Sequence, residues 1–205
     1  MPIRHVSTLC WGILTGWNFA IVDIKQRSLQ LLALLDVMFV MLSPPCTAFS
    51  VLQRLWNNKR RDPAIVQQEQ EEGAGYVNHS MDAASEQLRR GRFFCFEHPS
   101  SSSAWALPAV RQIRENPEVF TVTFDQCMVG LQSPLYGKPM RKRTRLMTNS
   151  WAIVNNFRGL MCDKSHGEHQ RIQGAEAGVR LSVHAQLYPR GMVERLAAAA
   201  QAMER

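Results

Sequence analysis

The stretch that decides the fold is residues 37–50, VMFVMLSPPCTAFS, in which an unbroken apolar run ends at two prolines. Apolar residues without polar alternation are typical of a central strand of a parallel sheet, buried on both faces. Pro44 and Pro45 exclude immediate continuation as a helix, because proline lacks a backbone N–H and clashes with the preceding turn. The pattern therefore predicts a buried strand that opens into a stiff loop carrying Cys46.

Short apolar runs alternate with longer amphipathic stretches along the rest of the chain, which predicts an α/β fold with crossover helices. Asp62 and Pro63 are typical of a helix start, and Gly73-Ala74-Gly75 is expected to interrupt the helix that follows. Strands are expected over Val37–Leu42, Phe93–Phe96, Val119–Phe124 and Arg145–Thr148. Helices are expected over Ser28–Leu35, Ala64–Glu72, Met81–Arg90, Ala104–Arg114 and Gly191–Met203.

Composition favours one folded domain over residues 1–205 with a polyanionic partner. The chain has 205 residues, of which 45% are hydrophobic, and this is enough for a buried core. A formal net charge of +7 is concentrated at Lys59–Arg61, Arg89–Arg92 and Lys138–Arg145. Nucleic acid, and DNA in particular, is the expected partner, while the plain alternative is a basic but inert surface.

The cysteines and the apolar stretches bear on the compartment. Five widely spaced cysteines are an odd number, which favours reduced thiols over a disulfide framework. The run from Leu29 to Leu42 is interrupted by Asp36 and is shorter than the ~20 residues that a membrane span needs. No signal-peptide pattern is visible at the N-terminus. We therefore expect no membrane partner and an intracellular protein, nuclear in a eukaryote and otherwise cytoplasmic.

Two candidate reactive groups follow predicted strands, where open α/β sheets place their ligand crevices. Cys46 lies on the proline-stiffened loop, a position that can hold a nucleophile, although a structural thiol is an equally good interpretation from this residue alone. Glu97 leaves the aromatic strand Phe93–Phe96, and burial there should raise its pKa. A carboxyl group kept partly protonated can donate to a ring nitrogen, whereas a solvated or helix-capping Glu is the plainer alternative.

A third feature is basic. Arg141, Arg143 and Arg145 alternate into a predicted strand, so that their side chains are expected on one face. Such a face can clamp a phosphate or a base carbonyl. A plain basic loop explains the same run without any site.

In this order, the Pro-Pro-Cys loop, the strand-end glutamate and the alternating arginines resemble the DNA cytosine-5 methyltransferases, including a divergent branch in retroelement-like and phage-like reading frames. The resemblance implies a Rossmann-like methyltransferase sheet. It implies that Cys46 attacks carbon 6 of an extruded cytosine, that Glu97 engages ring nitrogen 3, and that Arg143 and Arg145 steady the base. The substrate-contacting residues are expected to be Pro45, Thr47, Ser50 and Arg141, with loop-stabilising hydrogen bonds as the alternative for the two hydroxyls.

The same resemblance implies S-adenosylmethionine as methyl donor, yet its binding loop is not recognisable. Gly12 and Gly16 do not reproduce the family's Phe-x-Gly-x-Gly turn, and only 45 residues precede Cys46. His98-Pro99 replaces the usual Asn-Val after the glutamate. We therefore expect a base-handling half of the fold, truncated at its N-terminus, degenerate, or completed by another chain.

A second constellation carries possible metal ligands. Cys162, His166 and His169 offer soft and borderline donors within one loop, in the region 160–190, and Cys127 is a candidate fourth ligand. A structural zinc is the cofactor that this spacing indicates, while a solvated loop is the alternative.

Two rival functions remain open from sequence. One is a non-catalytic nucleic-acid-binding domain of a mobile element, in which the same pocket persists as architecture. The other is a cysteine-dependent hydrolase, which would need His98 or His184 within hydrogen-bond reach of the Cys46 thiol.

Overall fold

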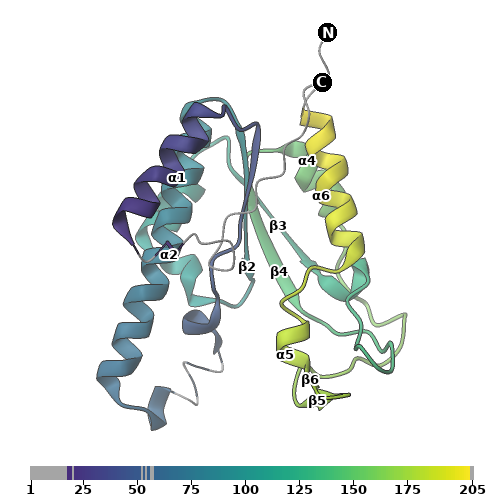
Figure 1. The fold of residues 1–205 in the computed structure, drawn as a ribbon. Helices are drawn as coiled ribbons and strands as arrows, with labels where there is room; N and C mark the ends of the chain where they lie inside the picture. Colours follow the sequence, from purple (N-terminus) through teal and green to yellow (C-terminus); the bar gives the residue numbers. More distant parts are fainter. Residues whose placement is uncertain (1–17, 20, 52, 54, 56–57, 204–205) are drawn as a thin grey trace.

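The computed structural model describes residues 18–19, 21–51, 53, 55 and 58–203, which form a mixed α/β fold (Figure 1). The helices are α1 (Val22–Leu34), α2 (Pro63–Arg89), α3 (Pro108–Arg114), α4 (Trp151–Phe157), α5 (Leu181–His184) and α6 (Arg190–Met203). Short 3-10 helices are η2 (Thr47–Phe49), η4 (Asn58–Arg60), η5 (Ser103–Ala106) and η6 (Gln126–Val129). The strands are β1 (Phe39–Leu42), β2 (Phe93–Pro99), β3 (Phe120–Asp125), β4 (Arg143–Thr148), β5 (Ala175–Glu176) and β6 (Val179–Arg180).

Strands β1 to β4 form one mixed sheet in the order β1-β2-β4-β3. β1 and β2 are parallel, with Leu42 opposite Phe96. β4 runs antiparallel to both of its neighbours and brings Arg143 opposite Asp125. The carboxyl-terminal ends of β1, β2 and β3 and the amino-terminal end of β4 therefore lie at the same end of the sheet.

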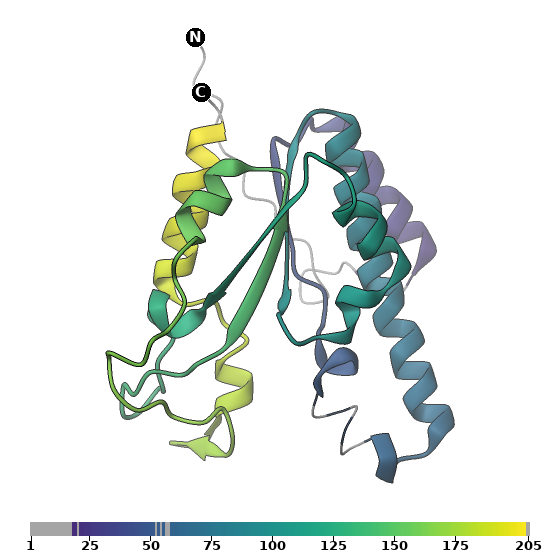
Figure 2. The same ribbon diagram turned by 180° about the vertical axis from the view of Figure 1, so that it is seen from behind.

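Helices cover both faces of this sheet, as the two opposite views show (Figure 1, Figure 2). On one face α2, η5 and α3 enclose a core that includes Phe94, Phe96 and Trp105. On the other face α4 and α6 enclose a second core that includes Phe124, Leu146 and Phe157. Strand β2 contributes to both cores, because successive side chains of a strand point to opposite faces.

The predicted strand over Val37–Leu42 is confirmed as β1, but its predicted central position is wrong. Among the described strands β1 is an edge strand, and all four of its residues are half-buried. An apolar run cannot distinguish burial by a neighbouring strand from burial by helices and loops. Parallel pairing with β2 through the crossover helix α2 is as the alternation of elements predicts.

The predicted interruption at Gly73-Ala74-Gly75 is wrong, because α2 is continuous over 27 residues. Its predicted start is confirmed, since the Asp62 side chain accepts a hydrogen bond from the Ala64 N–H (2.8 Å). A glycine inside a helix costs only about 1 kcal/mol, which tertiary packing can offset. Here the packing explains the residue: a Cβ at Gly73 would lie 3.1 Å from the ring of Phe49, in the turn after Cys46.

Smaller differences follow the same logic. The helix predicted over Ala104–Arg114 is divided into η5 and α3, because Pro108 begins a new helical turn at the first position. α4 was not predicted from its sequence pattern, although Ser150 caps it. No helix in the described part of the chain combines the length and apolarity needed to cross a membrane.

Candidate functional site

Two of the predicted reactive groups, Cys46 and Glu97, lie at this end of the sheet. Cys46 lies in the loop after β1, and Glu97 lies in β2. Burial raises the pKa values of both groups, and the charge of Lys142 lowers both. The charge of Glu97 also raises the pKa of Cys46. The Cys46 thiol, the Glu97 carboxyl and the Lys142 ammonium thus form one electrostatically coupled group, which we call the thiol–carboxyl site.

Cys46 sits just before η2 and is half-buried. Its carbonyl oxygen accepts a hydrogen bond from the Phe49 N–H (3.1 Å), which closes the turn. Burial raises the pKa of the thiol, the Glu97 charge adds to the rise, and Lys142 opposes it. Cys46 is therefore a protonated thiol at neutral pH and is not activated in advance as a thiolate.

Glu97 is a buried carboxyl group with 6% of its surface exposed. Burial raises its pKa, and both the Lys142 charge and a hydrogen bond from Tyr188 oppose the rise. Tyr188 donates to Oε2 over 3.3 Å, and its hydroxyl also contacts Ser43 Oγ. Oε1 has no hydrogen-bond partner among the described residues. One oxygen of a buried carboxyl group with a raised pKa therefore lacks a hydrogen-bond partner in the described structure.

His98 follows Glu97 on the opposite face of β2. Its ring is fully buried, stacks on Phe96 at 5.7 Å between centroids and meets Phe49 edge to face. Burial and the charge of Lys142 together lower its pKa to about 4, although the nearby Pro45 backbone opposes the shift. Neither ring nitrogen has a hydrogen-bond partner within normal geometry among the described residues.

These contacts bear on the hydrolase alternative, which needs a histidine bonded to the Cys46 thiol. Both nitrogens of His98 lack such a bond. Nε2 of His184 is occupied by the Gln132 carbonyl oxygen at 3.0 Å. The described geometry therefore contains no cysteine–histidine pair at Cys46, and the hydrolase alternative has no structural support.

Sequence reasoning missed Lys142 and Tyr188. Lys142 lies between the arginines that attracted attention, and its Nζ donates to the Ala185 carbonyl at 3.1 Å. Tyr188 is 91 residues from Glu97 and belongs to no motif. Tyr188 also lines a hollow of about 320 Å³ together with His184 and Pro189. No local signal could have found it, because its role depends on how the chain folds back.

The three alternating arginines have different surroundings. Arg143 donates two hydrogen bonds to Asp125, at 3.0 and 3.1 Å, and Arg141 pairs with the same carboxylate at 3.2 Å. Arg145 instead lies over the ring of Trp105, 5.1 Å from its centroid. The predicted row of three available cations is therefore divided: two hold a buried carboxylate and one stacks on an indole.

The predicted substrate contacts of the loop are placed as follows. Pro45 directs its carbonyl oxygen toward His98. Thr47 begins η2, and Ser50 Oγ accepts a hydrogen bond from the Gln53 N–H at 3.2 Å. Ser50 thus has the loop-stabilising hydrogen bond that was its alternative role.

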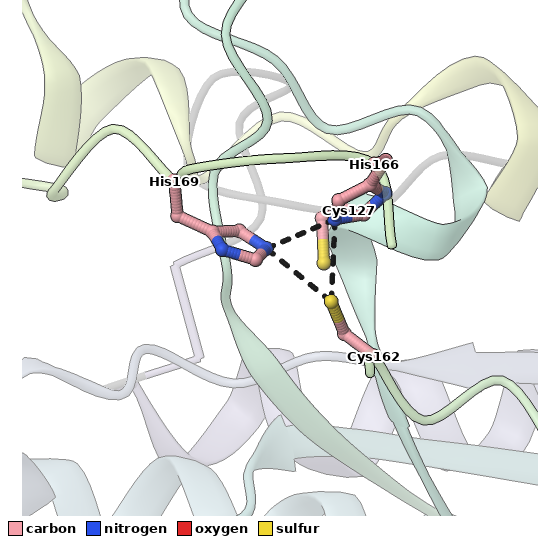
Figure 3. Close-up of side chains that lie close together, drawn as sticks. All are labelled: Cys127, Cys162, His166 and His169. Atoms are coloured by element: carbon pink, nitrogen blue, oxygen red, sulfur yellow. Dashed lines mark hydrogen bonds between the residues drawn. The ribbon is translucent and has the colours of Figure 1, made fainter. Parts of the chain in front are cut away.

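A separate cluster combines all the predicted metal ligands (Figure 3). Cys162 Sγ lies 3.2 Å from His166 Nε2 and 3.3 Å from His169 Nε2, and the two imidazole nitrogens are 3.0 Å apart. Cys127, the predicted fourth ligand, completes the group from η6, and all four ligand atoms lie within 4.8 Å of one another. This Cys/His cluster can hold a metal ion.

The pKa values of two of the four residues are shifted in the absence of a cation. Burial and the adjacent Cys162 sulfur raise the pKa of Cys127 to about 12. Burial and the charges of His166 and Arg141 lower the pKa of His169. Without a cation Cys127 stays a thiol, whereas metal ligation requires the thiolate.

The comparisons with known proteins add no relative: no family model matches the chain, and neither the curated proteins nor the solved structures gave a match. The glycines considered for the cofactor, Gly12 and Gly16, lie outside the described residues. The described residues before β1 form α1 and no strand. Within the described chain, no glycine-rich turn after a strand offers a cradle for S-adenosylmethionine.

Proposed function

We propose that the chain is a DNA cytosine-5 methyltransferase-like domain of Rossmann type, and that its thiol–carboxyl site receives one unpaired cytosine. The observation that carries the proposal is the free Oε1 of the buried, readily protonated Glu97 beside the Cys46 thiol. A parallel β1–α2–β2 unit that ends at both groups supports it, since ligands of open α/β sheets bind at the carboxyl ends of strands.

The hydrogen-bonding pattern explains why cytosine suits this site. A protonated Glu97 donates its proton to ring nitrogen 3 of cytosine, and the other oxygen can accept from the exocyclic amino group. Uracil carries a proton on nitrogen 3 and a carbonyl at position 4, so it needs the carboxyl proton on Oε2, the oxygen that already accepts a hydrogen bond from Tyr188. An unpaired or extruded base is required, because the Watson–Crick edge that carries nitrogen 3 and the amino group is occupied in a duplex.

A covalent step follows from the same arrangement. The Cys46 thiol loses its proton to water, and the thiolate forms a bond to carbon 6 of the base. The carbon 5–carbon 6 π electrons become a carbon 4–carbon 5 double bond, and the carbon 4–nitrogen 3 π electrons move to nitrogen 3, which takes up the proton of Glu97. Carbon 5 then has the electron density that a methyl donor needs. S-adenosylmethionine would supply that methyl group, although the described residues show no cradle for it.

The raised pKa of Cys46 favours one second candidate. If the thiol never ionises beside the base, the site binds cytosine without chemistry, and the domain is a nucleic-acid-binding module of a mobile element. The two candidates share base binding and differ only in the sulfur–carbon bond.

Base binding is tested with the full chain and two labelled DNA duplexes, which carry one unpaired cytosine or one unpaired uracil at the same place. Fluorescence anisotropy should show tighter binding to the cytosine duplex. Glu97→Ala should remove most of that preference, because alanine offers the base neither a donor nor an acceptor. Glu176→Ala, a change at another buried glutamate, is the matched control and should leave the preference intact. Equal binding of the two duplexes by the unaltered chain would contradict the proposal.

A further inference from the structure

The Cys/His cluster lies in one of the long connections of the fold. Its three loop ligands lie between the end of α4 at Phe157 and the start of β5 at Ala175, a connection with no regular secondary structure. Such long connections in compact domains are uncommon unless something orders them. The fourth ligand, Cys127, is buried on η6, so a bound ion would join this loop to the main sheet.

The ligand set and its spacing indicate the ion. Two sulfurs and two imidazoles are the donors that structural zinc prefers, and the cluster includes no carboxylate. Zinc bonds of about 2.0–2.3 Å in a tetrahedron place neighbouring ligand atoms roughly 3.3–3.8 Å apart. The three contacts among the Cys162, His166 and His169 ligand atoms are 3.0–3.3 Å, so small side-chain rotations complete the geometry. Four protein ligands leave no open position, as in structural rather than catalytic sites.

The cluster is connected to the arginines through Asp125. The Cys162 N–H donates to Asp125 Oδ2 at 3.0 Å, and Arg143 donates to both oxygens of the same carboxylate. Asp125 is fully buried and closes β3, directly before η6. A loop that is held by a metal therefore also fixes the carboxylate that orients Arg143.

A second connection leads to the thiol–carboxyl site. Gln126, the first residue of η6, donates its backbone N–H to the Lys142 carbonyl at 3.0 Å. Its side-chain amide donates to Thr144 Oγ1 at 2.9 Å. The residues on both sides of Arg143 are thus attached to the element that carries Cys127. Lys142 Nζ is held by the Ala185 carbonyl at 3.1 Å, and its charge lowers the pKa values of Cys46 and Glu97.

We propose that Cys127, Cys162, His166 and His169 bind one Zn²⁺ in a closed tetrahedral site, and that this site positions residues 141–144, which present Lys142 to the thiol–carboxyl site. The proposal does not depend on cytosine binding, because it concerns the ordering of the segment and not its ligand. The zinc is a structural centre, and the four ligands act on the neighbouring site only through η6 and Asp125.

Cobalt replacement tests the ligands in the full chain. Co²⁺ added to the metal-free protein should give the visible bands of tetrahedral coordination and a near-ultraviolet thiolate-to-metal band, and one equivalent of Zn²⁺ should abolish both. Cys162→Ser should weaken the thiolate band and lower zinc affinity at least tenfold. His166→Cys should retain a tetrahedral spectrum, which guards against a loss that merely reflects misfolding. Glu168→Gln, in the same loop, is the matched control and should behave as the unaltered chain. A weak octahedral spectrum without a thiolate band would overturn the site.

Hydrogen–deuterium exchange tests the positioning. Removing zinc with a chelator should increase deuterium uptake in peptides that cover residues 125–129, 141–145 and 160–170, while β1 and α2 keep their protection. Unchanged uptake over 141–145 would overturn the link to Lys142, even if zinc binds. Equal increases over β1 and α2 would also overturn it, because the ion would then support the whole fold and not this segment.

Discussion

The Tyr188 hydroxyl donates a hydrogen bond to Glu97 Oε2 across 3.3 Å, and this contact attaches the segment before α6 to the end of β2. The same hydroxyl reaches Ser43 in the loop after β1. One phenol therefore joins three parts of the chain around a buried carboxyl group. Oε1, the other carboxyl oxygen, is buried and has no hydrogen-bond partner among the described residues.

Tyr188→Phe should raise the pKa of Glu97, because the hydrogen bond from the phenol lowers it. The loss of the hydroxyl should also cost about 1 kcal/mol of unfolding free energy, as for a typical hydrogen bond. Carbon-13 NMR of the glutamate carboxyl groups during a pH titration measures the first effect. Tyr136→Phe, at an exposed tyrosine, is the control. A Glu97 pKa that stays the same or falls would contradict the interpretation.

His98 should make the fold sensitive to mild acid. Its pKa is about 4 in the fold against 6.5 for an ordinary histidine, so the unfolded chain binds a proton that the folded chain refuses. Stability is consequently lost as the pH falls from 6.5 to about 4, by roughly 3 kcal/mol at most.

Urea denaturation at several pH values measures that loss. His98→Phe should reduce the loss between pH 6.5 and 4, since phenylalanine keeps a ring among Phe96 and Phe49 without a titrating group. His184→Gln, at a half-buried histidine outside both cores, should retain the acid sensitivity of the unaltered chain. An identical pH dependence in His98→Phe would show that other groups cause it.

Arg143 and Arg145 should separate stability from DNA binding. Arg143→Ala removes two hydrogen bonds from the fully buried Asp125 and should cost about 1–3 kcal/mol of unfolding free energy. Arg145→Ala removes a contact with the Trp105 ring, which is worth about 1 kcal/mol or less.

If Arg145 contacts a phosphate, as the proposed function expects, its replacement should also reduce the salt dependence of DNA affinity by about one charge. Thermal denaturation and anisotropy titrations at several salt concentrations measure the two effects side by side. A larger loss of stability for Arg145→Ala than for Arg143→Ala would contradict the stabilising role given to Arg143.

Gly73 and Gly75 offer a matched pair in the middle of α2. Gly75→Ala should stabilise the fold by about 1 kcal/mol, because only Lys25 Nζ lies near the new Cβ, at 3.5 Å. Gly73→Ala should gain less or become destabilising, since its Cβ would press on Ala48 and Phe49 at 3.1 Å. The midpoints of chemical denaturation decide the order. A Gly73→Ala variant that is as stable as Gly75→Ala would show that the turn after Cys46 moves without cost.

The sequence predicted those features that depend on neighbours along the chain. The apolar run before Pro44 forms a strand and Asp62 caps a helix, as predicted. Cys162, His166 and His169 lie close together, as their spacing predicted, and could hold a metal ion. Cys127 could be named as a fourth ligand only as a candidate, because its distance from the loop depends on tertiary structure.

The failures are those of long-range packing. The Gly73 break was wrong because helix propensity is a weak term beside the contact with Phe49. The central position of β1 was wrong because strand order is not encoded in the strand itself. The alternation of arginines gave no sign that Arg141 and Arg143 would form ion pairs with Asp125, since this carboxylate lies on the neighbouring strand β3.

The most direct measurement of the central claim is a covalent trap. The full chain is incubated with S-adenosylmethionine and DNA that contains 5-fluorocytosine, and the denatured mixture is digested and analysed by mass spectrometry. The account predicts a denaturant-resistant adduct on Cys46 that Cys46→Ala abolishes and Glu97→Gln strongly reduces, while Thr121→Ala, at an exposed threonine of β3, retains it. DNA binding without any adduct on Cys46 would contradict the covalent chemistry and leave a domain that binds the base alone.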